Sequence, residues 1–433
     1  MKIEKAFEEF IDYLQDIAME DKVKRIKRIT KKLNQTYYNG NESEEEHFLL
    51  IGSLGRGTAI KNISDVDIAF EFPQELYDKY DSRKNNGQSD LLQDIKDTLL
   101  ELSPRTIVRG DGQVVVMEYT DYEVEICPFF YEDENSYLYP DAKHGGTWKT
   151  TKPVPEINES VAINELTGGN FKNICNVLRA WKTEQGFVFG GLLIDTLVYN
   201  FFVNNDEYYN SEFSDYPQLL KDLFKYLKDL NKEQDYWLAL GSNQRVYNKD
   251  SLFITKAKSA YNAIKDLDNE SDEMHTKLRS LFGNKFPGES LENNLFILHN
   301  AKNTEEFIEE QYKIDIRYPM EIFCNVSQDG WRDKTPLKFI RLLKTDKDLE
   351  FQAKIPETIK EPYDIKWKVR NVGELAHRKN QIRGQIIDGS KNKHIRTEKS
   401  SFKGPHYVEA YVIKNDVVIA RARVDVPINI KRK

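Results

Sequence analysis

Residues 51–68 read Ile51-Gly52-Ser53-Leu54-Gly55-Arg56-Gly57-Thr58-Ala59-Ile60-Lys61-Asn62-Ile63-Ser64-Asp65-Val66-Asp67-Ile68. The apolar run that ends at Ile51 predicts a buried strand, and the run from Val66 to Phe72 predicts another. The residues between them predict a tight, glycine-rich connection. Asp65 and Asp67 lie two residues apart on the second strand, so strand alternation points both carboxylates to the same face.

Glycine, serine and paired aspartates in this order indicate a site for a triphosphate and metal ions. Gly52 lets backbone N–H groups approach phosphate oxygens, and the hydroxyl of Ser53 can donate to one of them. Two carboxylates beside a phosphate site require a cation. Mg²⁺ (or Mn²⁺) fits, because it takes a few carboxylate oxygens and completes its shell with phosphate and water. The alternative is an ordinary hairpin loop followed by solvated edge-strand charges.

In-line displacement with two metal ions needs a third acid from a different strand. One ion lowers the pKa of the attacking sugar hydroxyl, and the other binds the donor triphosphate and its leaving pyrophosphate. Glu125 is the candidate, because Val124 and Ile126 alternate with it in a predicted strand. Glu123 lies on the same face of that strand and is the alternative ligand.

The order of the expected elements predicts an α+β fold with three regions. One amphipathic helix, or two helices broken near Glu20, precedes the two strands, and a helix and a strand meander follow them. The middle of the chain is almost wholly helical. From about Tyr318 the chain becomes strand-rich, and Leu337–Leu343 is among the expected strands. We therefore expect domains at residues 1–155, 156–315 and 316–433, the last of them sandwich-like.

Composition and length exclude several classes of protein. The 433 residues are 39% hydrophobic and 31% charged, as in globular proteins of two or three domains. No apolar run approaches the roughly 18 residues that span a bilayer, and the N-terminus does not resemble a signal peptide, so we expect a cytoplasmic protein without a membrane partner. Three scattered cysteines predict neither disulfides nor a zinc site. The net charge of −8 argues against a surface devoted to duplex nucleic acid.

Three basic clusters each leave two interpretations open. The segment from Lys22 to Lys32 is either a solvated helix face or a surface for an activating polyanion. In the strand-rich region, His377-Arg378-Lys379 and Lys391-Asn392-Lys393-His394 are either solvated loops or parts of a ligand site. The aromatic residues of that region favour a sandwich core over a binding platform; they are Tyr363, Trp367, Tyr407 and Tyr411.

The pattern Gly52-Ser53-x-x-x-Gly57-Thr58-x-Ile60, followed by Ser64-Asp65-Val66-Asp67, resembles the active-site motif of the polymerase-β-like nucleotidyltransferases. In this form it is similar to the bacterial cGAS/DncV-like enzymes and to oligoadenylate synthases. The resemblance implies a polymerase-β-like core, with Asp65 and Asp67 as metal ligands and Gly52 and Ser53 as contacts of the donor phosphates. The family's third acid is usually an aspartate in a Val-Asp-Ile-x-Pro context, and here Glu125 replaces it.

Two further segments resemble the same family. Trp148–Pro153 is similar to the segment that crosses from the catalytic lobe to the helical lobe. Asn173–Lys182 resembles the helix that offers a basic residue to the triphosphate, which implies Arg179 or Lys182 for that role; the two lie three residues apart, on one helix face. Without the resemblance they are equally well a surface-exposed basic pair. Gly190-Gly191 stand where relatives often have a nucleotide-contacting serine.

The strand-rich tail resembles, in position, size and strand pattern, the AGS-C sensor domain of some nucleotidyltransferases of bacterial antiphage systems. The resemblance implies an enzyme that joins ATP and/or GTP into a cyclic di- or trinucleotide second messenger, which activates a downstream effector. It also implies an activating ligand at the C-terminal domain. Two other functions stay open. The same core could make a linear oligonucleotide or adenylylate a protein or RNA, or it could sense nucleotides without catalysis, against which the intact Asp65 and Asp67 speak.

Overall fold

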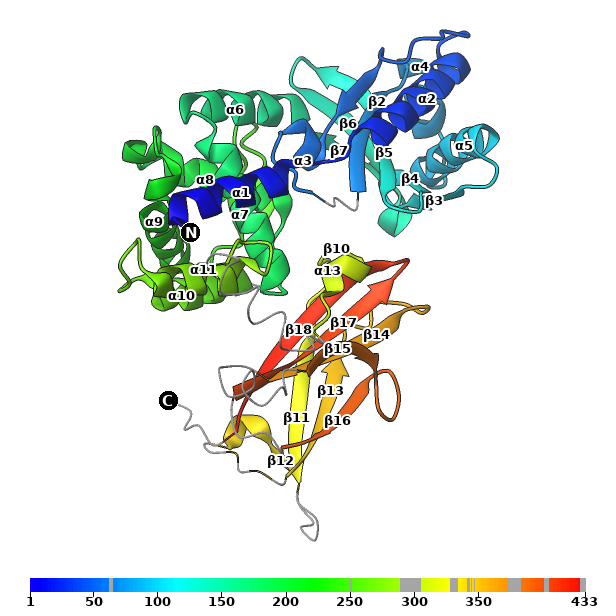
Figure 1. Cartoon of the computed structure of the whole chain (residues 1–433). Coiled ribbons are helices and arrows are strands. Elements are labelled where there is room, and N and C mark those ends of the chain that lie inside the picture. Colours follow the sequence, from blue (N-terminus) through cyan, green and yellow to red (C-terminus); the bar gives the residue numbers. More distant parts are fainter. Residues whose placement is uncertain are drawn as a thin grey trace. The chain divides into compact units, whose positions relative to one another are not determined.

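The computed structural model has a mixed α+β fold, as the sequence predicts (Figure 1). It describes all residues except 62–64, 249–250, 289–304, 328–333, 341–342, 344, 346, 372–382, 401–404 and 429–433. The chain divides into two compact units. One comprises residues 2–180 and 189–269, and the other comprises Met1 and residues 181–188 and 270–433. The domain boundaries expected near residues 155 and 315 do not coincide with this division and stay a prediction.

A seven-stranded sheet forms the core of the first unit. Its main strand order is β1-β2-β5-β4-β3, and β6 and β7 extend it from β5. β2 and β5 are parallel neighbours, whereas the other pairs are antiparallel. The strand that carries Asp65 and Asp67 therefore lies beside the strand that carries the predicted third acid. The strands are β1 (Phe48–Leu50), β2 (Asp65–Glu71), β3 (Ile107–Asp111), β4 (Val114–Glu118), β5 (Glu123–Asp133), β6 (Ser136–Asp141) and β7 (Thr147–Thr151).

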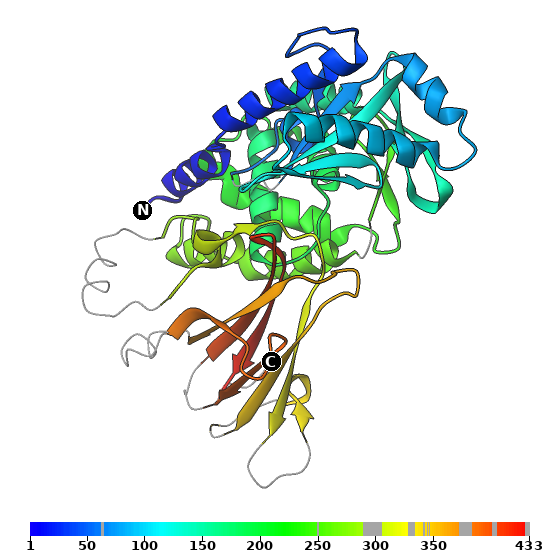
Figure 2. The same ribbon diagram turned by 90° about the vertical axis from the view of Figure 1, so that its right-hand side faces the viewer.

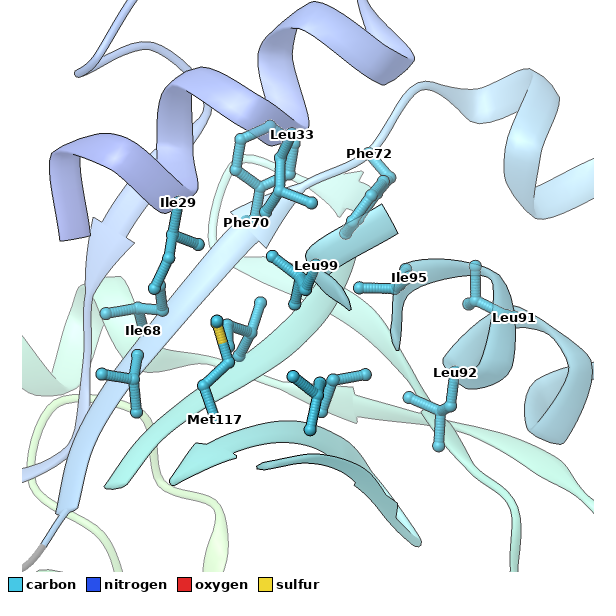
Figure 3. Close-up of a cluster of buried hydrophobic side chains, with 14 of the residues drawn as sticks. Ile29, Leu33, Ile68, Phe70, Phe72, Leu91, Leu92, Ile95, Leu99 and Met117 are labelled. Atoms are coloured by element: carbon cyan, nitrogen blue, oxygen red, sulfur yellow. The ribbon is translucent and has the colours of Figure 1, made fainter. Parts of the chain in front are cut away.

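Helices α2 (Glu20–Tyr37) and α5 (Gly87–Leu102) pack on this sheet through one hydrophobic cluster (Figure 3). Ile29 and Leu33 of α2 and Leu99 of α5 are fully buried there, together with Ile68 and Met117 of the strands. Full burial of such a side chain stabilises the fold by about 1.5–3 kcal/mol. The helical segment expected at the N-terminus consists of two helices, because α1 (Ile3–Gln15) precedes α2. A further helix, α4 (Gln74–Asp81), follows β2.

The basic residues of α2 pair with acidic neighbours. Lys24 lies 2.7 Å from Glu20, and Arg25 lies 2.8 Å from Asp21, both at the four-residue spacing of a helix face. Such partly exposed pairs are typical of a solvated helix face. Polyanion binding on this helix stays a prediction.

The helical region that the sequence predicts begins directly after β7. Proline in the first turn of α6 suits the change from strand to helix, because its missing N–H has no partner to lose there. The helices are α6 (Pro153–Leu166), α7 (Asn170–Glu184), α8 (Gly191–Val203), α9 (Tyr216–Asp229), α10 (Leu252–Ile264) and α11 (Asp272–Phe282). A hairpin of β8 (Tyr236–Leu238) and β9 (Arg245–Tyr247) interrupts them. In the described parts of the chain, no helix is both long and apolar enough to cross a membrane.

The strand-rich part of the second unit has two sheets that share a hydrophobic core, as the predicted sandwich does (Figure 2). The strand orders are β10-β18-β17-β14-β15 and β12-β11-β13-β16. Trp367, Tyr407 and Tyr411 are buried, which confirms their predicted place inside the domain. The strands are β10 (Lys313–Ile314), β11 (Glu321–Ser327), β12 (Thr335–Pro336), β13 (Asp348–Lys354), β14 (Asp364–Asn371), β15 (Arg383–Asp388), β16 (Ile395–Lys399), β17 (Pro405–Lys414) and β18 (Val417–Pro427).

The strand expected at Leu337–Leu343 is wrong over its first three residues. Residues 341–342 lie outside the described residues, and Leu343 forms an isolated β-bridge with Ile428. Leu337–Phe339 form a 3-10 helix that follows directly on Pro336. Phe339 is 71% exposed, so this apolar run does not present a continuous buried face to a sheet. β13, in contrast, was not predicted, although its buried residues Leu349 and Phe351 alternate with polar ones as a strand requires.

Candidate active site

The predicted acidic residues meet on two neighbouring parallel strands. In the register of β2 and β5, Asp67 is the partner of Glu125 and Asp65 is the partner of Glu123. Paired residues of neighbouring strands point to the same face of a sheet, so these four acids share one face. Their neighbours along each strand are buried on the opposite face. The alternation expected from the sequence is therefore present.

The two candidate third acids differ in their surroundings. Glu123 lies 3.3 Å from a guanidinium nitrogen of Arg109, which also contacts Glu118 at 2.8 Å. Glu123 therefore belongs to an ion-pair group on β3, β4 and β5. Glu125 lies at the level of Asp67 instead. The register favours Glu125 as the third ligand, and its role stays a prediction.

The thiol of Cys127 lies close enough to Asp67 and Glu125 for their charges to affect its pKa. Burial, and then the negative charges of Asp67 and Glu125, raise the pKa of the Cys127 thiol well above its usual value. Carboxylate oxygens, which Asp67 and Glu125 carry, are the donors that Mg²⁺ prefers over thiol sulfur.

Gly52 lies directly against the carboxylate of Asp67. It opens the one-turn helix α3 (Gly52–Gly55) with a φ of 63°, which glycine adopts readily. A Cβ atom at this position would overlap the carboxyl group of Asp67. The backbone N–H of Ile51 donates to the carbonyl of Asp67 at 3.1 Å, which holds the loop on the strand. Glycine is needed here for both its backbone angle and its small size.

The loop after Gly52 is closed by its own backbone. The carbonyl of Ser53 accepts hydrogen bonds from the backbone N–H groups of Thr58 at 2.8 Å and Ala59 at 3.1 Å. These bonds fold residues 53–59 back on themselves beside the acids. Ser53 thereby keeps a defined place next to Gly52, where the predicted contact with a phosphate requires it.

A buried ion cluster lies under the far end of this loop. The carboxylate of Asp195, on α8, has no exposed surface. It lies 2.7 Å from Nη1 of Arg179, on α7, and 2.9 Å from Nε of Arg56, in the loop. Burial alone would raise the pKa of the Asp195 carboxyl, but Arg179 and Arg56 outweigh it and lower the pKa to about 2. The hydroxyl of Thr58 donates to the same carboxylate at 2.9 Å.

The cluster connects the loop to three helices. Arg179 also donates to the hydroxyl oxygen of Thr58 at 3.0 Å, and Asn176 of α7 donates to the carbonyls of Thr58 and Ala59 at 2.9 and 3.0 Å. The hydroxyl of Ser160, on α6, donates to the carbonyl of Arg56 at 2.7 Å. Residues 56–59 are therefore held by side chains of α6, α7 and α8.

This placement bears on the predicted triphosphate contacts. Arg179 is buried and its guanidinium is engaged by Asp195 and Thr58, which favours a positioning role over direct contact with phosphate. Lys182, one turn further along α7, is partly exposed. Phosphate binding by either residue stays a prediction. The sequence analysis missed Asp195, although a single acid within the apolar run Leu192–Val198 was a signal.

The donor chemistry of the site fits Mg²⁺ or Mn²⁺, since both prefer carboxylate oxygens. Within the described residues, no three histidine, cysteine or acidic side chains converge closely enough to hold an ion by themselves. Mg²⁺ usually takes one or two carboxylates and completes its shell with water and substrate phosphates. Asp67 and Glu125, at the same level on adjacent strands, are placed to supply such a pair.

Comparison with known proteins identifies two domains. Residues 1–164 match the family described as the Second Messenger Oligonucleotide or Dinucleotide Synthetase domain. Residues 302–429 match the Adenylyl/Guanylyl and SMODS C-terminal sensor domain. Both matches confirm the resemblance inferred from the active-site motif and from the strand-rich tail.

A curated relative supports the same assignment. A probable cyclic nucleotide synthase of Bacillus cereus (strain VD146) is 23% identical over an alignment of 207 positions, and the match covers 41% of this chain. The match spans 60% of the length of that relative.

Two solved structures are also similar. The structure of Escherichia coli MS115-1 CdnC with ATP is 18% identical and has a TM-score of 0.48, over 66% of this chain and 98% of the other. Apo Vibrio cholerae DncV is 13% identical and has a TM-score of 0.44, over 66% of this chain and 88% of the other.

Proposed function

We propose that this chain, in which a domain of the second messenger oligonucleotide or dinucleotide synthetase family (residues 1–164) precedes an AGS-type sensor domain (residues 302–429), is a metal-dependent nucleotidyltransferase. It joins nucleoside triphosphates, ATP and/or GTP, into a cyclic di- or trinucleotide. The observation that carries the proposal is the pairing of Asp67 with Glu125 beside the backbone of Gly52. Carboxylates and a phosphate-binding loop then lie where a triphosphate and its metal ions can meet.

The residues of the chain have distinct roles in this proposal. Asp65, Asp67 and Glu125 would hold Mg²⁺ or Mn²⁺ together with water and substrate phosphates, and the ions would lower the pKa of the attacking hydroxyl and neutralise charge on the phosphates. The hydroxyl of Ser53 would donate a hydrogen bond to a phosphate oxygen, and the small Gly52 would let the backbone approach the same phosphate. Most of the rate enhancement in phosphoryl transfer comes from positioning and charge stabilisation. A loop that is held in one arrangement before the substrate binds serves that purpose.

The ion cluster around Asp195 provides this arrangement. Arg56 and Thr58 are tied to Asp195, so the loop does not have to be ordered again at each turnover. Lys182, partly exposed on α7, is the residue that we assign to the triphosphate. Arg179 acts on the substrate only through the loop.

The wider role follows from the domain composition. The cyclic product would activate a separate effector in bacterial antiphage signalling, in the cytoplasm, and a ligand at the C-terminal domain would regulate synthesis. Two alternatives use the same acids: synthesis of a linear oligonucleotide, and adenylylation of a protein or RNA. A non-catalytic sensor is disfavoured because Asp65, Asp67 and Glu125 are all present.

Product analysis tests the proposal. The purified full chain is incubated with the four α-³²P-labelled nucleoside triphosphates and Mg²⁺ or Mn²⁺, treated with phosphatase and analysed by chromatography. We expect a phosphatase-resistant product that the Asp67→Asn variant does not form. Asp78→Asn, at an exposed position of α4, is the control and should retain synthesis.

Other outcomes distinguish the alternatives. A phosphatase-sensitive product indicates a linear oligonucleotide. Label that appears on protein or RNA added from a lysate indicates adenylylation. Undiminished synthesis by Asp67→Asn would contradict the assigned site.

A further inference from the structure

The C-terminal β-domain contains a cavity of about 610 Å³. Its walls come from segments far apart in the sequence: the start of β13, the first residue of β15, strand β16 and the turn before β16. Its volume lies within the range of small-molecule sites, about 300–1,000 Å³. None of the site residues discussed above contributes to it.

The lining of the cavity is strongly charged and unbalanced. Among the lining residues that the structure describes, five are cationic and three are acidic, so that positive charge exceeds negative charge by two. The chain as a whole has a formal net charge of −8, so this excess is local. The cationic residues are Lys334, Arg383, Lys391, Arg396 and Lys399. Leu349 is the one apolar residue among the described lining residues.

Two of the acids each hold two cations in place. Glu350 lies 2.7 Å from Lys334 and 2.5 Å from Lys391, and these lysines lower the pKa of its carboxyl. Each lysine is more than half exposed, with 53% and 58% of its side-chain surface accessible. The pairs therefore leave a net positive charge in contact with solvent.

Glu398 has the same arrangement with arginines. Arg383 contacts it through two parallel hydrogen bonds of 2.8 and 3.1 Å, and Arg396 contacts it at 2.5 Å. Burial would raise the pKa of the Glu398 carboxyl, but the two arginines lower it overall. Arg396 also donates to the carbonyl of Asp388 at 3.3 Å. Two guanidinium groups against one carboxylate leave a net positive charge in this part of the wall.

Arg383 has a strained backbone. Its φ is 59°, in the left-handed region that non-glycine residues rarely adopt. Such strain costs roughly 1–3 kcal/mol and is concentrated at ligand sites. The hydrogen bonds to Glu398 hold the guanidinium in the cavity wall in this conformation.

We propose that this cavity binds a small, multiply charged phosphate anion through Lys334, Lys391, Arg383 and Arg396. Arginine and lysine side chains held a short distance apart suit a di- or triphosphate group, which needs several charge-assisted donors at once. Most of the described lining side chains are charged, which favours contact with phosphates over contact with a base or an acyl chain. The source is either free polyphosphate or the phosphates of a nucleotide. The proposal goes beyond the synthase activity and does not depend on it.

Calorimetric titration of the full chain with sodium tripolyphosphate tests the proposal, with EDTA and 0.15 M salt present. The variant that removes pocket charge is Lys334→Gln/Lys391→Gln. Both lysines are largely exposed, so we expect the variant to fold. We expect the variant to bind tripolyphosphate at least about tenfold more weakly than the wild type. Each charge-assisted hydrogen bond to the ligand is worth more than a neutral one. Lys354→Gln/Lys360→Gln removes the same charge from exposed positions outside the cavity and should bind like the wild type.

A second control separates this cavity from the active site. Lys182→Gln removes a charge that we assign to the active-site triphosphate, so it measures any tripolyphosphate that binds there instead of in the cavity. Repeating the titrations with ATP identifies the source: equal affinity indicates phosphate alone, and tighter binding that is lost in the pocket variant indicates a nucleotide. Equal affinity of the wild type and the pocket variant would overturn the proposal. A loss in Lys182→Gln or in Lys354→Gln/Lys360→Gln as large as the loss in the pocket variant would overturn it as well.

Discussion

Two groups of charged residues contact the glycine-rich loop, and they differ in their access to water. At the start of the loop, Gly52 touches Asp67 in a partly exposed row of acids. At its end, Arg56 and Thr58 contact the fully buried Asp195. The buried group is neutralised by arginines of the chain and holds the loop in place. The exposed group is the one that a metal ion and a substrate can reach. Burial thus separates a structural role from a chemical one within a single loop.

Removal of the buried acid should have the largest effect on stability. In Asp195→Ala, Arg56 and Arg179 lose their shared partner while they stay buried, which costs about 3–5 kcal/mol of unfolding free energy. Urea unfolding followed by circular dichroism measures this. The control Glu165→Ala, at an exposed position of α6, should change stability by less than about 0.5 kcal/mol. A loss below about 1 kcal/mol in Asp195→Ala would mean that the arginines find other partners.

A methyl group added to Gly52, at the start of the glycine-rich loop, should affect activity more than stability. Gly52→Ala and Gly57→Ala both place alanine at a positive φ, of 63° and 69°, so each should lose about 1–2 kcal/mol of stability. Only at Gly52 does the added Cβ meet Asp67, whereas at Gly57 it meets open space. Displacement of a ligand by about 1 Å can reduce turnover about a hundredfold.

The measurement is the initial rate of nucleotide product formation, normalised to the folded fraction. Gly57→Ala should retain much more activity than Gly52→Ala. Similar rates in the two variants would indicate that the backbone angle, and not the approach to Asp67, is what the site requires.

Acid should lower the free energy of unfolding by a smaller amount than the removal of Asp195, because it removes only the charge of that residue. The pKa of Asp195 is lowered from 3.8 to about 2 in the folded chain, so its charge stabilises the fold above pH 4 and this contribution is lost as the pH falls through about 2. The shift corresponds to about 2 kcal/mol. Unfolding free energies of the wild type and Asp195→Asn between pH 5 and pH 2 measure it. The difference between them should narrow towards pH 2, and a constant difference would contradict the assignment.

Patterns that depend on neighbouring residues were predicted well from the sequence. Helices α2, α5 and α7 follow from apolar residues at helical spacing, and the shared face of Asp65 and Asp67 follows from strand alternation. The loop between β1 and β2 follows from its glycines. The strand expected at Leu337–Leu343 failed because an apolar run alone does not show which side of it will be covered.

The sequence by itself thus determined the class of fold, the strand–loop–strand unit and the two aspartates, because periodicity and turn preferences act over a few residues. Only the tertiary structure decided which glutamate lies beside Asp67, that Arg179 is paired with Asp195, and that Lys334, Arg383 and Arg396 line one cavity. Strand register and buried ion pairs join residues that are far apart in the chain, and their partners are chosen by the packing of the whole domain.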